Sequence, residues 1–230
     1  MINRLHTVIF DAGGTLIDSD NIFEVISLAT SKFGSPISTQ DIEDEFMRLK
    51  KDLSLPFTDI KTLLSSILQK VQRNGSKQDI YNEVSRLYKK TFLETIKLYD
   101  GTIELLTALK KSNVKLILLS DADDDLLHAE LDQLDIKKYF DHLLISSIMQ
   151  SYKPSDKVIG CVKEVCPGSS DGVLMIGDSV DDINTAKKLG ISSILISESQ
   201  NVGSHGQTHT VRMLKEILPL LKNNFSLKEA

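Results

Sequence analysis

The chain has 230 residues, of which 41% are hydrophobic and 26% are charged, and its formal net charge is -5. This length suits one large domain or a core with a smaller insertion, and the acidic balance argues against a surface for nucleic acid. The sequence shows no apolar run long enough to span a bilayer and no secretory leader in residues 1–10. We therefore expect a cytoplasmic protein with no membrane partner.

The first predicted element is a strand at residues 8–10, a short β-branched and aromatic run. It ends at Asp11, and two glycines then predict a tight turn. Open α/β sheets build their sites at the carboxyl ends of strands, so Asp11 is a candidate site residue. On these residues alone, an ordinary turn stabilised by the Asp side chain is the alternative.

A block of helices follows, with no strand between them. The predicted helices cover residues 23–33, 39–51, 60–73 and 79–98. Such a block, inserted after the first strand of an α/β sheet, is most simply a second subdomain that covers the first. We therefore assign residues 1–17 and 98–230 to the core and residues 18–97 to a helical cap.

Strands and helices alternate in the rest of the chain. Strands are predicted at 114–119, 142–146, 172–176 and 193–196, and helices at 101–111, 123–134, 155–166, 180–190 and 211–221. This alternation predicts an α/β fold with a three-layer, Rossmann-like parallel sheet. Residues 198–210 are interpreted as a polar loop, in which His205 and His209 are more typical of a solvated segment than of a metal site.

The two cysteines, Cys161 and Cys166, are five residues apart in one of these predicted helices. They lie on different faces of that helix and cannot cross-link the fold from there. We interpret both as small core residues in a reducing compartment.

Four polar motifs stand at the predicted strand ends, in a fixed order along the chain. Together they resemble the motifs of the haloacid dehalogenase-like hydrolase superfamily, whose members are mostly phosphatases, and the resemblance covers nearly the whole chain. The motifs are Asp11-Ala-Gly-Gly-Thr15-Leu, Leu118-Leu-Ser120-Asp, Tyr152-Lys153-Pro154 and Gly177-Asp178-Ser-Val-Asp-Asp182.

The resemblance implies a magnesium site. Asp11 would attack phosphorus and form an acyl phosphate, which divides one difficult step into two. A carboxylate repels a phosphate dianion, so Mg²⁺ is expected between them. Asp11, the backbone carbonyl of Gly13 and Asp178 would supply hard oxygen ligands, and Asp182 would ligate or support that shell.

The resemblance also implies a binding site for a small phosphorylated metabolite. Lys153 would neutralise the phosphate and hold the nucleophile, and Ser120 would donate a hydrogen bond to a phosphate oxygen. Gly14, Thr15 and Asp121 complete the candidate substrate-binding set. The identity of the metabolite and the oligomeric state stay open.

Gly13 is a departure from the family pattern. Most phosphatases of the family have a second Asp at this position, which protonates the leaving group and later activates water. General acid–base help of this kind is typically worth roughly 10²–10⁴-fold in rate. We therefore expect reduced turnover, and a binding or regulatory protein that has lost turnover is the alternative.

Two other branches of the family are further alternatives. Haloacid dehalogenases need no metal and lack the acid found here at Asp178, and Arg48 is the sole arginine near their halide-binding position. Phosphonate hydrolases need a lysine from the cap, which offers Lys32, Lys50, Lys51 and others.

Asp121 follows the hydroxyl of the second motif, where many relatives have an amide or a small residue. It could act as a surrogate acid or cap the helix that follows. We favour the cap, because Asp is a preferred N-cap residue and the acids at 123–125 mark the same helix start.

Overall fold

The computed structural model describes residues 4–19, 21–32, 37–52, 57–69, 77–199 and 203–225. Its main sheet consists of β1 (Thr7–Phe10), β4 (Lys115–Ser120), β5 (His142–Ile145), β6 (Val173–Gly177), β7 (Ser192–Ile196) and β8 (His209–Val211). These strands lie in the order β5-β4-β1-β6-β7-β8, and every neighbouring pair is parallel. The predicted α/β class and parallel sheet are confirmed.

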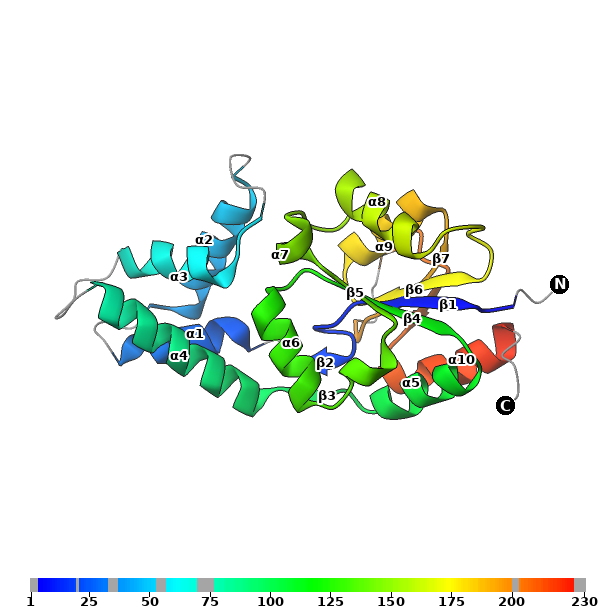
Figure 1. Ribbon diagram of the computed structural model, residues 1–230, viewed down its shortest axis with the longest axis horizontal. Coiled ribbons are helices and arrows are strands. Elements are labelled where there is room, and N and C mark those ends of the chain that lie inside the picture. Colours follow the sequence, from blue (N-terminus) through cyan, green and yellow to red (C-terminus); the bar gives the residue numbers. More distant parts are fainter. Residues whose placement is uncertain are drawn as a thin grey trace.

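Helices cover both faces of this sheet, as Figure 1 shows. On one face lie α5 (Thr102–Lys111) and α10 (Ile217–Asn224), and on the other lie α8 (Asp156–Val165) and α9 (Val180–Leu189). Successive side chains of β1 enter different cores: Val8 and Phe10 join one hydrophobic cluster, and Ile9 joins the other. A strand buried on both faces is mostly apolar, which explains the continuous run at residues 8–10.

One further helix follows β4, and a short one follows β5. They are α6 (Asp124–Gln133) and α7 (Ser146–Met149). Figure 1 places α6 between the sheet and a second group of helices, so it forms the boundary between the two parts of the chain.

That second group consists of α1 (Ile22–Ser31), α2 (Thr39–Lys50), α3 (Ile60–Gln69) and α4 (Lys77–Thr95). The helices lie on the side toward which β1 points (Figure 1), and α4 also contacts α6. The chain leaves the sheet through β2 (Ile17–Asp18) and returns through β3 (Lys97–Leu98), and these two strands pair antiparallel.

The structure corrects several predicted boundaries. Lys97 and Leu98 form strand β3 rather than the end of a helix, because the returning chain pairs with residues 17–18. Residues 209–211, predicted as the end of a loop and the start of a helix, form β8, in which Val211 pairs with Ile196. The last helix begins only at Ile217, after a 3₁₀ turn. The predicted helix ends at 33 and 73 lie outside the described residues.

Within the described ranges, no helix has the length and apolar character needed to cross a membrane. Cys161 and Cys166 are free thiols that pack, half-buried, against the hydrophobic cluster under α8 and α9. This agrees with their interpretation as core residues.

Candidate active site

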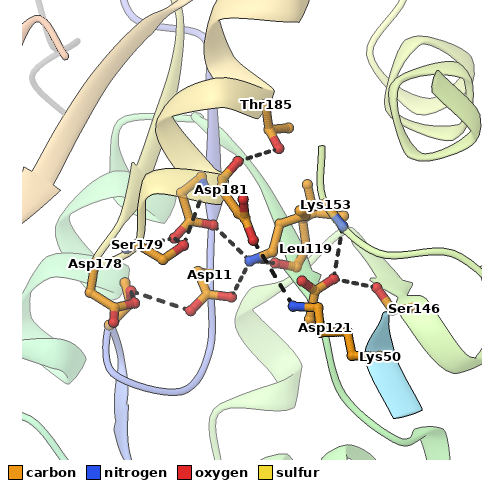
Figure 2. Close-up of polar contacts among 12 residues, drawn as sticks. Asp11, Lys50, Leu119, Asp121, Ser146, Lys153, Asp178, Ser179, Asp181 and Thr185 are labelled. Carbon is orange, nitrogen blue, oxygen red and sulfur yellow. Dashed lines mark hydrogen bonds and ion pairs between the residues drawn. The ribbon is translucent and has the colours of Figure 1, made fainter. Parts of the chain in front are cut away.

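Three adjacent strands of the sheet deliver polar residues to the same edge. Asp11 follows β1, Ser120 is the last residue of β4, and Asp178 follows β6, and β1 lies between the other two strands. Asp11 and Asp178 face each other in Figure 2, and Asp182, in the first turn of α9, completes the group. Oxygen atoms of Asp11, Asp178 and Asp182 all lie within 4.8 Å of one another.

The turn after Asp11 fits closely against Asp178. Gly14 has a φ of 74°, and a side chain there would collide with the Asp178 carboxylate, so this position requires glycine. The next residue, Thr15, is fully buried. Its hydroxyl donates to Asp178 Oδ1 at 3.0 Å and, at 3.4 Å, lies within reach of Asp11 Oδ2. Thr15 therefore holds two carboxylates together, and its predicted contact with substrate stays a prediction.

Lys153 is the cation of this group. Its side chain is only 4% exposed, and Nζ donates to Asp11 Oδ1 at 2.6 Å and to Asp182 Oδ1 at 2.7 Å. Burial alone would lower the pKa of Lys153, but the charges of Asp11 and Asp182 outweigh burial and hold that pKa well above its ordinary value. Lys153 is therefore a fixed ammonium that joins two carboxylates (Figure 2).

Asp182 is fully buried, and both of its oxygens are engaged. While Oδ1 accepts from Lys153, Oδ2 accepts from the backbone N–H of Ser179 at 3.0 Å and from the Ser179 hydroxyl at 2.6 Å. The Ser179 hydroxyl oxygen accepts in return from the Asp182 backbone N–H, so the pair forms a capping box at the start of α9. Asp182 is thus fixed by helix capping and by the ion pair together.

This group contains three carboxylates and one ammonium, so negative charge is in excess. Burial and the nearby charges of Asp182 and Asp178 raise the pKa of Asp11, and Lys153 opposes that rise. Asp178 as a whole residue is exposed, but protein atoms surround its carboxylate. This burial of the carboxylate and the charge of Asp182 raise the pKa of Asp178, and the hydrogen bond from Thr15 opposes the rise. Hard oxygen donors with unbalanced negative charge fit a divalent cation such as Mg²⁺.

Asp121 makes contacts that the sequence did not predict. Its Oδ1 accepts from the Ser146 hydroxyl at 2.5 Å and from the Lys153 backbone N–H at 3.1 Å, so it positions the lysine-bearing loop (Figure 2). The preferred prediction that Asp121 caps the next helix is wrong, because the N-cap of α6 is Asp123. Asp121 is held away from that helix start by partners that lie far along the chain.

A cavity of about 370 Å³ opens above these residues. Asp11, Gly13, Ser120, Asp121, Lys153 and Asp178 line it from the core. Apolar side chains from both parts of the chain form its walls: Ile22, Phe23, Phe46, Phe57, Ile60, Phe92, Leu126 and Leu127. A volume of this size suits a small metabolite.

The second group of helices contributes a cation to the cavity. Of the candidate lysines that the structure describes, Lys50 lines it, with Nζ 4.6 Å from the ring centre of Tyr152 and 4.0 Å from Asp181 Oδ2. Arg48, the candidate halide ligand, is instead largely exposed and pairs with Glu45 on its own helix.

Ser19 occupies the space above Gly13. A Cβ added at Gly13 would lie 2.8 Å from the Ser19 hydroxyl oxygen, and both residues line the cavity. The backbone of Gly13 is not in the left-handed region, so among the described residues this movable hydroxyl alone lies where a side chain at position 13 would extend.

The comparisons with known proteins are consistent with this geometry. The sequence profile described as "Haloacid dehalogenase-like hydrolase" matches residues 8–196. The chain belongs to the haloacid dehalogenase-like hydrolase family. It is therefore a hydrolase, as the four motifs predicted.

Relatives within the haloacid dehalogenase-like family have different activities. A phosphorylated carbohydrates phosphatase of Thermotoga maritima is 25% identical over 83% of this chain and 84% of its own length. An (S)-2-haloacid dehalogenase 4A of Burkholderia cepacia is 22% identical over 97% of this chain and 98% of its own length. A solved Thermotoga maritima structure, whose suggested identity is a β-phosphoglucomutase, has a TM-score of 0.76 and 24% identity, covering 95% of this chain and 99% of its own.

The structure thus brings together Asp11, Gly13, Ser120, Asp121, Lys153, Asp178 and Asp182. Among the described residues, the cluster that could hold a metal ion consists of carboxylates and does not include His205 or His209. Gly14 and Thr15 lie beside it in the loop after β1. The sequence did not indicate Ser19 or Glu130, which also line the cavity. For Glu130 a signal was present, because it lies four residues after Leu126 on the buried face of α6.

Proposed function

We propose that this hydrolase is a Mg²⁺-dependent phosphomonoesterase that acts through Asp11 on a small phosphorylated metabolite. The observation that carries the proposal is the convergence of Asp11, Asp178 and Asp182 around Lys153 at the floor of the cavity. The phosphatase named among its relatives supports the same reaction class. Residues 18–97 would act as the cap, and their helices supply part of the cavity wall.

Asp11 would be the nucleophile. One of its oxygens forms a bond to phosphorus as the bond to the alcohol oxygen breaks, and that oxygen leaves with the electron pair. Water then attacks the acyl phosphate and releases inorganic phosphate, which restores the carboxylate. Lys153 fixes the rotation of Asp11 through its 2.6 Å contact and adds positive charge beside the phosphate.

Asp11, Asp178 and the carbonyl of Gly13 would hold the metal ion. Asp182 would orient the group, because both of its oxygens already accept hydrogen bonds. When bound, Mg²⁺ would offset the repulsion between the carboxylates and the phosphate dianion. Because Gly13 offers no acid, the departing alcohol oxygen takes its proton from solvent, and esters of poor leaving groups are expected to react slowly.

The test is phosphate release from p-nitrophenyl phosphate and from a panel of phosphorylated metabolites, with Mg²⁺ and with EDTA. Wild type is expected to be active only with the metal, and Asp11→Asn is expected to be inactive. Asp132→Asn, which changes an exposed carboxylate on α6, is the matched control and should keep wild-type rates. Equal rates for wild type and Asp11→Asn would refute the proposal.

A binding or regulatory protein is the second candidate, and Gly13 is the observation that favours it. Calorimetry that shows micromolar affinity for a phosphorylated ligand, with no turnover across the panel, would establish this role. A dehalogenase is disfavoured, because Asp178 is present and Arg48 is engaged by Glu45. Chloride release from 2-chloropropionate that persists in EDTA would reverse that judgement.

A further inference from the structure

Glu130, on α6, is a buried carboxyl group in the cavity wall. The residue is only 6% exposed, and it lines the same cavity that reaches Asp11. Its side chain has no hydrogen-bond or ion-pair partner in the part of the chain that the structure describes. Burial raises the pKa of Glu130 to about 7, and no neighbouring charge contributes to that rise.

An unpaired carboxyl group in an apolar wall is costly to keep. Leu126, Leu127 and Phe92 line the cavity with Glu130, and replacing the carboxyl by an apolar group would remove the cost of burying it. Tyr88, on α4, is a second unsatisfied group: it is fully buried, and its hydroxyl has no partner within the described ranges. Burial, and then the charges of Asp123 and Glu130, raise the pKa of this hydroxyl. A ligand that donates hydrogen bonds would satisfy the carboxyl.

The charge of the cavity indicates which donors fit. Besides Asp11 and Asp178, its lining includes four acids, Asp121, Asp123, Glu130 and Asp181. The remaining cation, Lys50, lies beside Asp181. A second anionic group on a ligand would face this excess of negative charge, whereas an ammonium or hydroxyl group would be stabilised by it.

We propose that Glu130 selects the leaving group of the substrate. The preferred substrate is a phosphate monoester whose alcohol carries a hydrogen-bond donor, an amine above all or a hydroxyl, on an apolar body, and phosphorylated carboxylic acids are rejected. This inference rests on the proposed function, since the phosphate of such an ester would lie at Asp11. Glu130 would act as a specificity-determining residue that contacts the alcohol part alone.

The test compares ω-aminoalkyl phosphates with ω-carboxyalkyl phosphates of matched chain length. Both series lack an activated leaving group, so the missing acid at Gly13 affects them equally and the ratio of their kcat/KM values isolates recognition. A hydrogen bond to a charged group is worth roughly 10- to 100-fold in affinity. Wild type should therefore prefer the amines by about this factor, and Glu130→Gln should lose most of that preference.

Two further variants make the result specific. Glu104→Gln changes an exposed carboxylate on α5 and should leave the ratio as in wild type. Glu130→Asp keeps the charge and should restore part of the preference. A wild type that does not distinguish the two series, or a Glu130→Gln variant that keeps the wild-type ratio, would overturn the inference.

Failure of the proposed function would give a different result. In that case no phosphate ester is hydrolysed, p-nitrophenyl phosphate included, and the preference is measured by calorimetry as the ratio of Kd values for the same two series. Turnover without a preference for amines would refute only the role of Glu130.

Discussion

Replacing Glu130 by Gln should stabilise the protein, and the gain should depend on pH. Each pKa unit corresponds to about 1.4 kcal/mol, so a rise of the Glu130 pKa from its ordinary 4.5 to about 7 costs about 3 kcal/mol of folding free energy when the group is ionised. Below about pH 4.5 the carboxyl is protonated in both the folded and the unfolded chain, and this cost is absent. As the pH rises toward about 7 the unfolded chain loses the proton first, so wild-type stability falls.

Urea unfolding followed by circular dichroism, near pH 4.5 and above pH 7, measures this difference. Glu130→Gln should exceed wild type by up to about 3 kcal/mol above pH 7 and by little near pH 4.5. Glu104→Gln, on the exposed face of α5, should show no comparable dependence on pH. A Glu130→Gln variant that is no more stable than wild type above pH 7, or whose advantage does not grow with pH, would refute the reasoning.

Three further changes test the loop and helix that hold the carboxylates. Gly13→Asp, combined with Ser19→Ala to make room, should raise kcat for alkyl phosphates by roughly 100-fold. The gain for p-nitrophenyl phosphate should be much smaller, because only alkyl phosphates need a proton on the leaving oxygen. Equal gains for the two kinds of substrate would contradict a role of the new Asp as general acid. Gly14→Ala should lower the free energy of unfolding by more than about 1 kcal/mol, through its positive φ and its collision with the neighbouring carboxylate, and a melting temperature equal to that of wild type would contradict this. Ser179→Ala should cost about 1 kcal/mol by removing the capping hydroxyl from Asp182, and chemical denaturation would detect the loss; an unchanged midpoint would show that the capping box adds nothing.

The convergence of Asp11, Ser120 and Asp178 could be predicted from the sequence because their positions follow from local rules. A buried strand is a continuous apolar run, and parallel neighbours place their ends at one edge, so Asp11, Ser120 and Asp178 had to lie near one another. The starts of two helices also follow a local rule, because a serine is the N-cap residue of each: Ser155 accepts from the Val158 N–H at the start of α8, and Ser179 caps α9.

Contacts between distant segments could not be predicted in the same way. Asp121 stands where an N-cap residue would be expected, but Ser146 and the loop of Lys153 reach it from 25 and 32 residues away. Strand β8 was missed because it has only three residues, two of them polar, and its place in the sheet is set by pairing with β7. The burial of Glu130 depends on other helices, α4 among them, that pack against α6.

The paired strands β2 and β3 carry the chain from the sheet to the four helices and back. Since both crossings lie side by side, the inserted helices could be exchanged for another set without re-routing any strand of the sheet. An exchange of this kind would replace Lys50 and Phe92 but retain Glu130, which belongs to the part of the chain that also holds Asp11. A chimaera whose foreign helices again bury Glu130 should therefore inherit discrimination against alcohols that carry a carboxylate, while acquiring a new preference for size.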